Sequence, residues 1–429
     1  MVKVRQLRDE HSCYFGVYNL KLVIQNSRLI ERKFIVLKKD KNTIIKFTKL
    51  HKYLSVGKRK TSIRIDSTSG KKIYYVCKML NYLFITHSHV YKLRNVNDIT
   101  TEHLHHFMFD YAMNRDDELS YPTEATVTQC VNAVIDFVEN YLDDNNYIRG
   151  KDQIFTKVIT SRNKYKKIVQ KNVPTFKVYN NGSVKNIFRD MPNSAFNLIM
   201  SYAATHYRHI FFLMSLSAYA GMRPSEACNV RRENSPLGKG IYIYKEGKSI
   251  KKIKCDLREE KLLRSDLVPV GGIKKERMQK VYPKFIDAFL RAYELHQEFL
   301  SDQKYEVDYG PMSINKNGMA ITYNTYYTNF REMIDEMKPL FLNHSNPEIS
   351  TFGHMLLEHN IGPHIFRHWF SVRLTLYGED VANLQYWRGD NSPKSAITYL
   401  QNKGELSKQL AHVNNVMFDF MENSAKEII

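Results

Sequence analysis

Helical periodicity over two long parts of the chain is the feature that most restricts its fold. From about residue 71 to 144, apolar side chains recur three and four positions apart, which predicts a small bundle of amphipathic helices. A second helical region runs from about residue 192 to the C-terminus and is interrupted by a strand-rich stretch at 240–270. The pattern predicts a mainly α chain with a small antiparallel β-sheet, an α+β fold with two helical parts.

The first 60 residues differ from the rest. They hold 16 Lys and Arg against four acidic residues, an excess of 12 positive charges. Short alternating runs at 20–25, 33–37 and 43–47 predict the strands of a small basic sheet. We therefore expect a basic, β-rich N-terminal region (1–60), a helical domain (61–165), a linker (166–184) and a C-terminal domain (185–429).

Charge and cysteine content narrow the class of protein. A formal net charge of +20 over 429 residues favours a polyanionic partner, most often nucleic acid, over a merely solvated basic surface or an anionic membrane. The longest apolar stretches, such as 210–220, are too short to span a bilayer, and the first ten residues are charged where a signal peptide would be apolar. Five scattered cysteines without a CxxC pair argue against disulfides and zinc and favour a cytoplasmic setting.

A glycine–proline turn places an arginine at a predicted helix start. The run 211–220 (FFLMSLSAYA) predicts a helix ending at Gly221, a residue suited to the left-handed conformation, and Pro224 suits the first turn of the next helix. Arg223 would then lie where free backbone N–H groups favour a phosphate, and its guanidinium can bind two phosphate oxygens. Alone, this pattern fits a surface ion pair as well.

A second basic pair lies in 362–368 (GPHIFRH). His364 and Arg367 are three residues apart, so they share one face of a helix that Pro363 can begin. His364 can exchange a proton near neutral pH, and Arg367 supplies a fixed positive charge. The apolar residues between and after them point to a core.

The third piece is a turn at 387–393 (WRGDNSP), followed by a short predicted helix with Tyr399, 32 residues after Arg367. The order Gly-x-Arg-x-Ser-Glu, then His-x-x-Arg, then a glycine turn before a tyrosine resembles the tyrosine recombinase (phage integrase) family. The resemblance covers roughly residues 185–405. The preceding helical bundle lies where that family has its core-DNA-binding domain, and the C-terminal part corresponds to the catalytic domain.

This resemblance implies a chemistry. Tyr399 would attack a DNA phosphate and form a 3′-phosphotyrosyl bond, and Arg223 with Arg367 would stabilise the developing charge. Either His364 would accept the tyrosine proton, or the positive field of the two arginines would favour the phenolate. A 5′-hydroxyl could then attack the bond and rejoin the DNA. No cofactor and no metal are expected.

The family also uses a lysine in the turn between its second and third strands as general acid. Residues 267–270 (LVPV) resemble the end of the third strand, and counting back seven positions from Val268 gives Lys261. Lys254 is the alternative. Four further lysines stay open, namely Lys245, Lys248, Lys251 and Lys252.

Nine positions before Tyr399 the family usually has His or Trp, which donates a hydrogen bond to the phosphate, and this chain has Asp390. An ionised carboxylate cannot donate. Asp390 therefore orients a neighbour as an acceptor, or is protonated, or Trp387 supplies the N–H instead. Glu226 resembles an acidic residue of the family and is expected to hold His364 or a backbone group.

The sequence thus predicts a site-specific DNA recombinase that integrates or excises a mobile element. It would act on double-stranded DNA as a homotetramer, away from membranes, and an accessory DNA-bending or directionality protein could assist it. The apolar stripe at 406–420 suits a terminal helix that packs on a neighbouring protomer, or on its own domain. Two alternatives remain, a type IB topoisomerase-like enzyme and a catalytically silent DNA-binding protein of the same fold.

Overall fold

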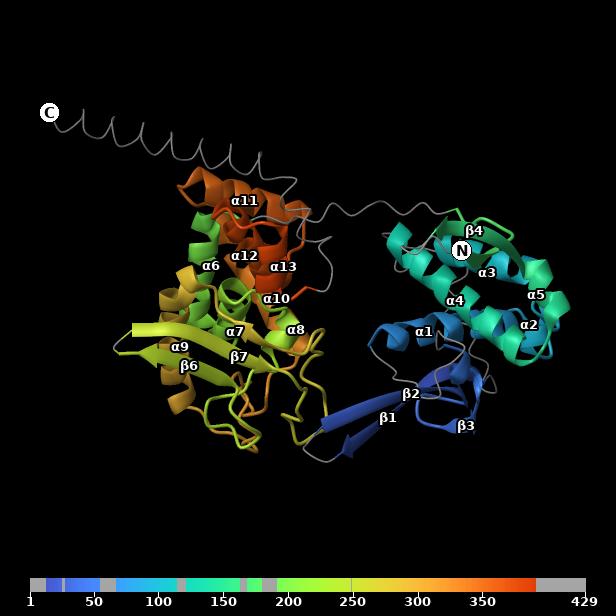
Figure 1. Cartoon of the computed structure of the whole chain (residues 1–429), viewed down its shortest axis with the longest axis horizontal. Helices are drawn as coiled ribbons and strands as arrows, with labels where there is room; N and C mark the ends of the chain where they lie inside the picture. Colours follow the sequence, from blue (N-terminus) through green and yellow to red (C-terminus); the bar gives the residue numbers. More distant parts are fainter. Residues whose placement is uncertain are drawn as a thin grey trace. The chain divides into compact units, whose positions relative to one another are not determined.

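The computed structural model describes residues 13–24, 28–54, 67–113, 121–162, 168–179, 191–247 and 249–390. Its contacts divide the chain into two compact units, one of residues 1–22 and 30–186 and one of residues 23–29 and 187–429. Each unit has a hydrophobic core of its own. The predicted fold class, mainly α with small antiparallel sheets, is confirmed (Figure 1).

A three-stranded sheet belongs to the first unit. Its strands β1 (Tyr14–Ile24), β2 (Arg28–Lys38) and β3 (Ile44–Phe47) lie in that order, and β2 and β3 run antiparallel. They overlap the three alternating runs that predicted a basic sheet. Ile35 of β2 is fully buried and belongs to the core of the helical bundle, so the sheet and the helices share one core.

The helical bundle of this unit corresponds to the periodic region at 71–144. Helix α4 (Glu124–Asp144) buries Val127, Val134, Phe137 and Val138 on one face, and it contacts α1 (Ser67–Asn81). Thr123 caps α4, because its hydroxyl accepts the N–H of Thr126 at 3.3 Å. The shorter elements are η2 (Leu50–Leu54), the π-helical turn η3 (Tyr82–Thr86), α2 (Ser88–Tyr91), η4 (Val96–Asp98), α3 (Thr101–Met113) and α5 (Ile148–Ile154).

A β-hairpin includes the first part of the predicted linker at 166–184. Strands β4 (Phe155–Arg162) and β5 (Ile168–Pro174) pair antiparallel, with Phe155 opposite Pro174 and Arg162 opposite Ile168. The linker prediction rested on polar and basic side chains, but a strand is held by its paired backbone groups and tolerates such side chains. The rest of the predicted linker, at 180–184, lies outside the described residues.

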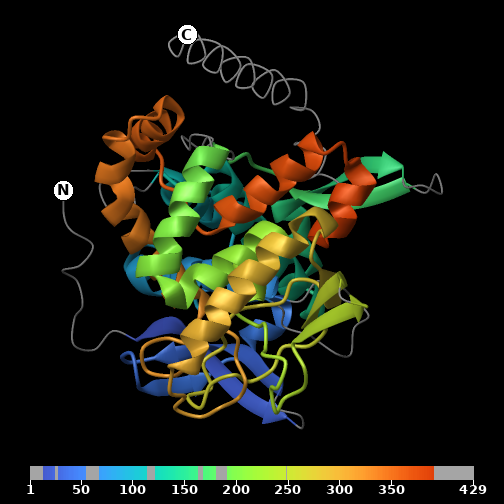
Figure 2. The same ribbon diagram turned by 90° about the vertical axis from the view of Figure 1, so that its left-hand side faces the viewer.

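Helix α7 (Arg208–Tyr219) lies at the centre of the second unit and is buried from Ile210 to Ala218. A helix that is apolar all round needs neighbours on every side. Five helices contact it, namely α6 (Asn193–His206), α8 (Pro224–Ala227), α9 (Ile286–Ser301), α10 (Tyr323–Leu342) and α12 (His364–Leu376). The hydroxyl groups of its two buried serines donate to carbonyls one turn back, at 3.0 and 3.2 Å, so both are hydrogen-bonded within the core. Figure 2 shows this central packing from the side.

The remaining helices of this unit are η5 (Pro283–Phe285), α11 (Pro347–Glu358) and α13 (Val381–Arg388). Helix α11 contacts α10 and α6, and α13 contacts α12. None of the helices in the described ranges is long and apolar enough to cross a membrane.

The sheet of the second unit corrects the predicted third strand. Strands β6 (Ile241–Glu246), β7 (Ser249–Leu257) and β8 (Arg277–Lys280) are antiparallel in the order β6-β7-β8. The residues predicted to end a strand, 267–270, are not in one, and Leu267 has a φ of 56°. Their backbone is satisfied in a loop, since Asp266 accepts the N–H of Val268 at 3.0 Å. The true third strand was missed because it is short and polar.

Candidate active site

Arg223 lies at a turn between α7 and α8, as the glycine–proline pattern suggested. Gly221 has a φ of 62°, and a Cβ there would come within 2.5 Å of the Phe370 ring, so the turn needs glycine. Pro224 is the first residue of α8, and Arg223 is its N-cap in extended conformation. The side chain of Arg223 is largely buried, with 14% of its area exposed.

Glu226 is fully buried and accepts hydrogen bonds from several groups around this turn. Its carboxylate accepts the backbone N–H of Arg223 at 3.2 Å, Nη1 of Arg223 at 2.9 Å and Nη2 of Arg277 at 2.8 Å. It also accepts the backbone N–H of Lys274 at 3.3 Å. Burial raises the pKa of Glu226, but the hydrogen bond and charge of Arg277, with the charges of Arg223 and Arg367, outweigh it and lower the pKa to about 2. Glu226 is therefore ionised and holds two arginines.

Arg367 comes from α12 and is almost completely buried, with 3% exposed. Its Nη1 donates to the carbonyl of Gly221 and to that of Arg388 at 3.0 Å, and its Nη2 donates to Oδ1 of Asp390 at 2.7 Å. Burial and the nearby Arg388 and Arg223 lower the pKa of Arg367 to about 9. It stays protonated at neutral pH.

His364 is the first residue of α12 and is exposed. The loss of water around its ring and the positive charges of Arg367, Arg223 and Arg388 lower the pKa of His364 to about 4. The imidazole is therefore neutral at pH 7 and able to accept a proton.

Asp390 follows α13 and is 7% exposed. Its Oδ1 accepts Nη2 of Arg223 and Nη2 of Arg367, and its Oδ2 accepts Nε of Arg388 at 2.8 Å. Arg388 is itself buried and donates Nη1 to Oγ of Ser371 at 2.6 Å. Asp390 thus links Arg223, in the turn before α8, to Arg367 of α12 and Arg388 of α13.

Three other predicted residues make contacts of their own. The ammonium group of Lys261 pairs with Glu259 at 2.7 Å. Lys254 lies over the ring of Tyr244 at 5.2 Å. The ring of Trp387 is edge-on to Tyr282 at 5.1 Å, and its carbonyl accepts Nε2 of Gln279 at 2.7 Å.

Tyr399 lies outside the described residues, as does the apolar stripe at 406–420. Tyr399 follows Asp390 by nine residues.

Three residues of the site were missed from the sequence. Arg277 shares Glu226 with Arg223, Arg388 shares Asp390 with Arg367, and Lys274 belongs to the turn before β8. A signal for Lys274 existed, because counting seven positions back from Val281, just after the true third strand, gives Lys274. No spacing rule pointed to Arg277 or Arg388.

The protonation state of His364 can be measured directly. We expect its ring proton resonance to move with a midpoint near pH 4 in the folded protein, with His364→Gln used for assignment. Because this pKa lies below the ordinary value of about 6.5, the unfolded chain takes up a proton that the folded chain does not. His364 should therefore destabilise the fold as the pH falls from about 6.5 towards 4. A midpoint between pH 6 and 7 would contradict this.

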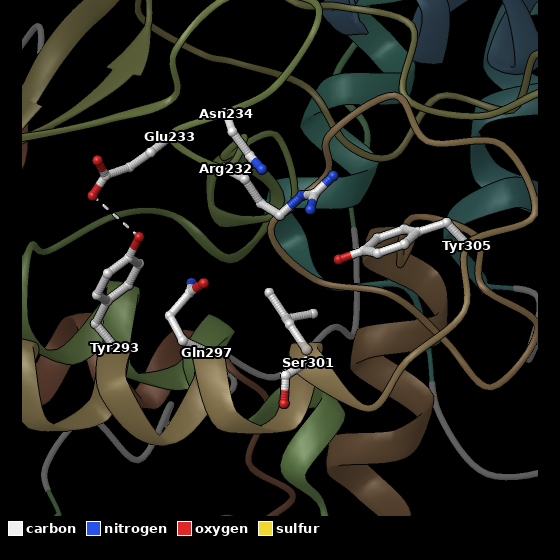
Figure 3. A pocket seen from close by; sticks show the side chains of 8 residues that line it. Arg232, Glu233, Asn234, Tyr293, Gln297, Ser301 and Tyr305 are labelled. Carbon is white, nitrogen blue, oxygen red and sulfur yellow. Dashed lines mark hydrogen bonds between the residues drawn. The ribbon is translucent and has the colours of Figure 1, made fainter.

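A separate polar pocket of about 260 Å³ lies beside α9, and none of the predicted catalytic residues lines it (Figure 3). Tyr293 donates to Glu233 there at 3.2 Å, and Arg232 pairs with Asp308 and lies over the ring of Tyr305. The charges at this pocket are therefore balanced within the protein.

No family model and no curated protein matches the chain. Among solved structures, the XerH site-specific recombinase bound to difH substrate is 16% identical, with a TM-score of 0.45 over 77% of this chain and 76% of that chain. The Tn1549 transposon integrase in complex with transposon right end DNA is 13% identical, with a TM-score of 0.48 over 78% and 89%. A lambda integrase dimer bound to a COC′ core site is 12% identical, with a TM-score of 0.42 over 82% and 92%.

Proposed function

We propose that this chain is a site-specific DNA recombinase of the tyrosine recombinase type, which cleaves and rejoins DNA through Tyr399. The observation that carries the proposal is the convergence of Arg223 and Arg367, 144 residues apart in sequence, on one buried carboxylate. His364 begins the same helix that carries Arg367, and Tyr399 follows nine residues after that carboxylate. A paired guanidinium site beside a neutral histidine suits attack on a phosphodiester.

Each residue then has a role in the reaction. Neutral His364 accepts the proton of Tyr399, whose phenolate oxygen attacks the phosphorus atom. Arg223 and Arg367 stabilise the charge on the non-bridging oxygens. The bond from phosphorus to the 5′ oxygen breaks, and the product is a 3′-phosphotyrosyl bond with a free 5′-hydroxyl. In the reverse direction a 5′-hydroxyl attacks this bond, so the DNA is rejoined without ATP.

Lys274 is the general acid in this proposal, in place of Lys261 or Lys254. Its backbone N–H binds the carboxylate that also binds Arg223, so its turn adjoins the site, and its side chain is exposed. The ammonium group of Lys261, in contrast, is paired with Glu259.

We expect Lys274→Ala to slow cleavage by about 100-fold, because a general acid typically contributes that much or more. Lys261→Ala should stay within about threefold of the wild type, as expected for a residue outside the proton transfer. A duplex with sulfur in place of the bridging 5′ oxygen should restore the rate of Lys274→Ala, because a thiolate leaves without a proton. Rescue of Lys261→Ala instead would move the assignment back to Lys261.

A basic, aromatic surface on the sheet supports DNA as the substrate. Lys254 and Lys280 lie directly opposite each other on β7 and β8, an arrangement of like charges that costs stability unless an anion binds there. The charge of Lys254 is the main cause that lowers the pKa of Lys252. Exposed Tyr386 lies beneath Lys280. These groups suit phosphate contacts along a DNA backbone.

The proposal is tested with duplexes that carry a nick and a randomised central region, incubated with the full chain in EDTA and without ATP. We expect a fraction of the DNA to become bound covalently to the protein at its 3′ end and to release a 5′-hydroxyl that a kinase can phosphorylate. Sequencing the captured DNA gives the target site. If wild-type protein captures no DNA from the library, the silent DNA-binding alternative is favoured.

We also propose a location, an assembly state and a domain organisation for the chain. The chain would act in the cytoplasm as a homotetramer on DNA that integrates or excises a mobile element, with residues 61–165 as a core-DNA-binding domain and 185–429 as the catalytic domain. Exchange of strands between two captured duplexes supports a recombinase, whereas relaxation of supercoils without exchange favours a type IB topoisomerase-like enzyme.

A further inference from the structure

The carboxylate of Asp390 lies among three guanidinium groups. Oδ1 receives one N–H from Arg223 and one from Arg367, and Oδ2 receives Nε of Arg388 at 2.8 Å. With 7% of the residue exposed, water contributes little to this cluster. All three arginines are therefore held by one side chain.

The backbone fixes where this carboxylate lies. Gly389 ends α13 with a φ of 63°, which turns the chain back towards the site. A Cβ at Gly389 would come within 2.2 Å of Nε of Arg277, so only glycine lets Arg277 approach. Asp390 then donates its N–H to the carbonyl of Gln385 at 3.0 Å, and its own carbonyl accepts Nε2 of Gln385 at 3.2 Å. Asp390 is thus placed by the main chain as well as by its ion pairs.

The cluster would be unstable without an anion. Arg388 and Arg223 both lower the pKa of Arg367, while Asp390 raises it, which shows that the guanidinium groups repel one another and that Asp390 opposes this repulsion. Removing one partner of a buried ion pair leaves charges uncompensated. Such arginines separate or take an anion from solution.

We propose that Asp390 is a positioning residue that holds Arg223, Arg367 and Arg388 in one cluster and limits the positive charge of the site. This proposal rests on the proposed function. Four arginines at 223, 277, 367 and 388 face two carboxylates at 226 and 390, so these side chains carry a net charge of +2, to which Lys274 adds one more. A phosphodiester carries one negative charge, and its transition state with an attacking phenolate carries two. The site therefore favours the transition state over the ground state.

Asp390→Asn should separate binding from catalysis. The net charge rises by one and the neutral amide oxygen competes less strongly for Arg223 and Arg367, so inorganic phosphate should bind about tenfold more tightly. The arginines lose their common partner, so cleavage of the captured duplex should slow by about 100-fold. Asp390→Glu keeps the charge but moves it by one methylene, so phosphate affinity should stay near the wild-type value while cleavage slows.

Phosphate affinity is measured by calorimetry and by the rise in melting temperature that phosphate causes. The cleavage rate is measured in a single turnover on the captured duplex. Asp256→Asn is the matched control. Asp256 is 7% exposed and pairs with Arg231 and Arg258. The next residue, Leu257, is paired with Arg277 of β8 and shares its face of the sheet, so Asp256 points to the opposite face. This control should lose stability but keep the phosphate affinity and the cleavage rate.

The outcomes separate the two proposals. Tighter phosphate binding with slower cleavage in Asp390→Asn supports a positioning role, and unchanged values or the loss of both overturn it. If Asp390→Asn does not fold, Asp390→Glu decides, because a cleavage rate equal to that of wild type would overturn the role. If wild-type protein captures no DNA, the recombinase proposal fails, while the phosphate affinities still test whether Asp390 competes for the arginines.

Discussion

Replacing Tyr399 by phenylalanine is expected to abolish the covalent protein–DNA adduct while the affinity for the captured duplex stays within about twofold. The substitution removes only the attacking oxygen, and water in its place would yield hydrolysis and no covalent intermediate. We expect adduct formation to fall by at least about 10⁴-fold, since no other group supplies the bond. The measurement is denaturing electrophoresis of labelled duplex beside a binding titration.

The control for this result is a second tyrosine in the same unit. Tyr377 is exposed and stacks on Tyr282, so Tyr377→Phe should form the adduct at the wild-type rate. If Tyr399→Phe still captures DNA, the nucleophile lies elsewhere, and peptide mapping of the adduct would identify it.

Replacing Arg367 by methionine is expected to have the second largest effect, on both cleavage and folding. The side chain donates to two backbone carbonyls and to Asp390 while it is 3% exposed. Its loss removes a buried donor from both carbonyls and one of the three arginines from Asp390, so the free energy of unfolding should fall by about 3–5 kcal/mol, measured by urea denaturation. Cleavage should slow by about 1000-fold, because one fixed charge on the phosphate is lost.

Two further variants separate the fold from the chemistry. Arg231→Met removes another buried arginine, which binds the carbonyl of Gly238 at 2.9 Å and Asp256 at 3.2 Å, and it should cost similar stability without slowing cleavage. Arg367→Lys keeps a charge but cannot make the same three bonds, so it should remain well below the wild-type rate. A fully active Arg367→Lys would show that charge alone suffices.

The sequence by itself determined the parts of the site that local rules govern. Glycine and proline restrict the backbone, so the turn at Gly221 and Pro224 and the helix start before His364 could be predicted from a few residues each. Helical spacing likewise predicted the bundle and the buried helix α7. Strand β8 was not predicted, because its four residues carry no apolar alternation. The count that led to Lys261 therefore started from residues 267–270, which are not in a strand.

Only the tertiary structure decided which charges meet. Arg277 reaches Glu226 from a strand 51 residues away, and Arg388 and Arg367 reach Asp390 from two different helices. Asp390 was a departure from an expected pattern in the sequence, with three explanations open, and in the fold it is an acceptor for three arginines. The physical reason is that ion pairs among buried groups depend on distances between elements that no local spacing encodes, whereas turns and helices depend on the residues within them.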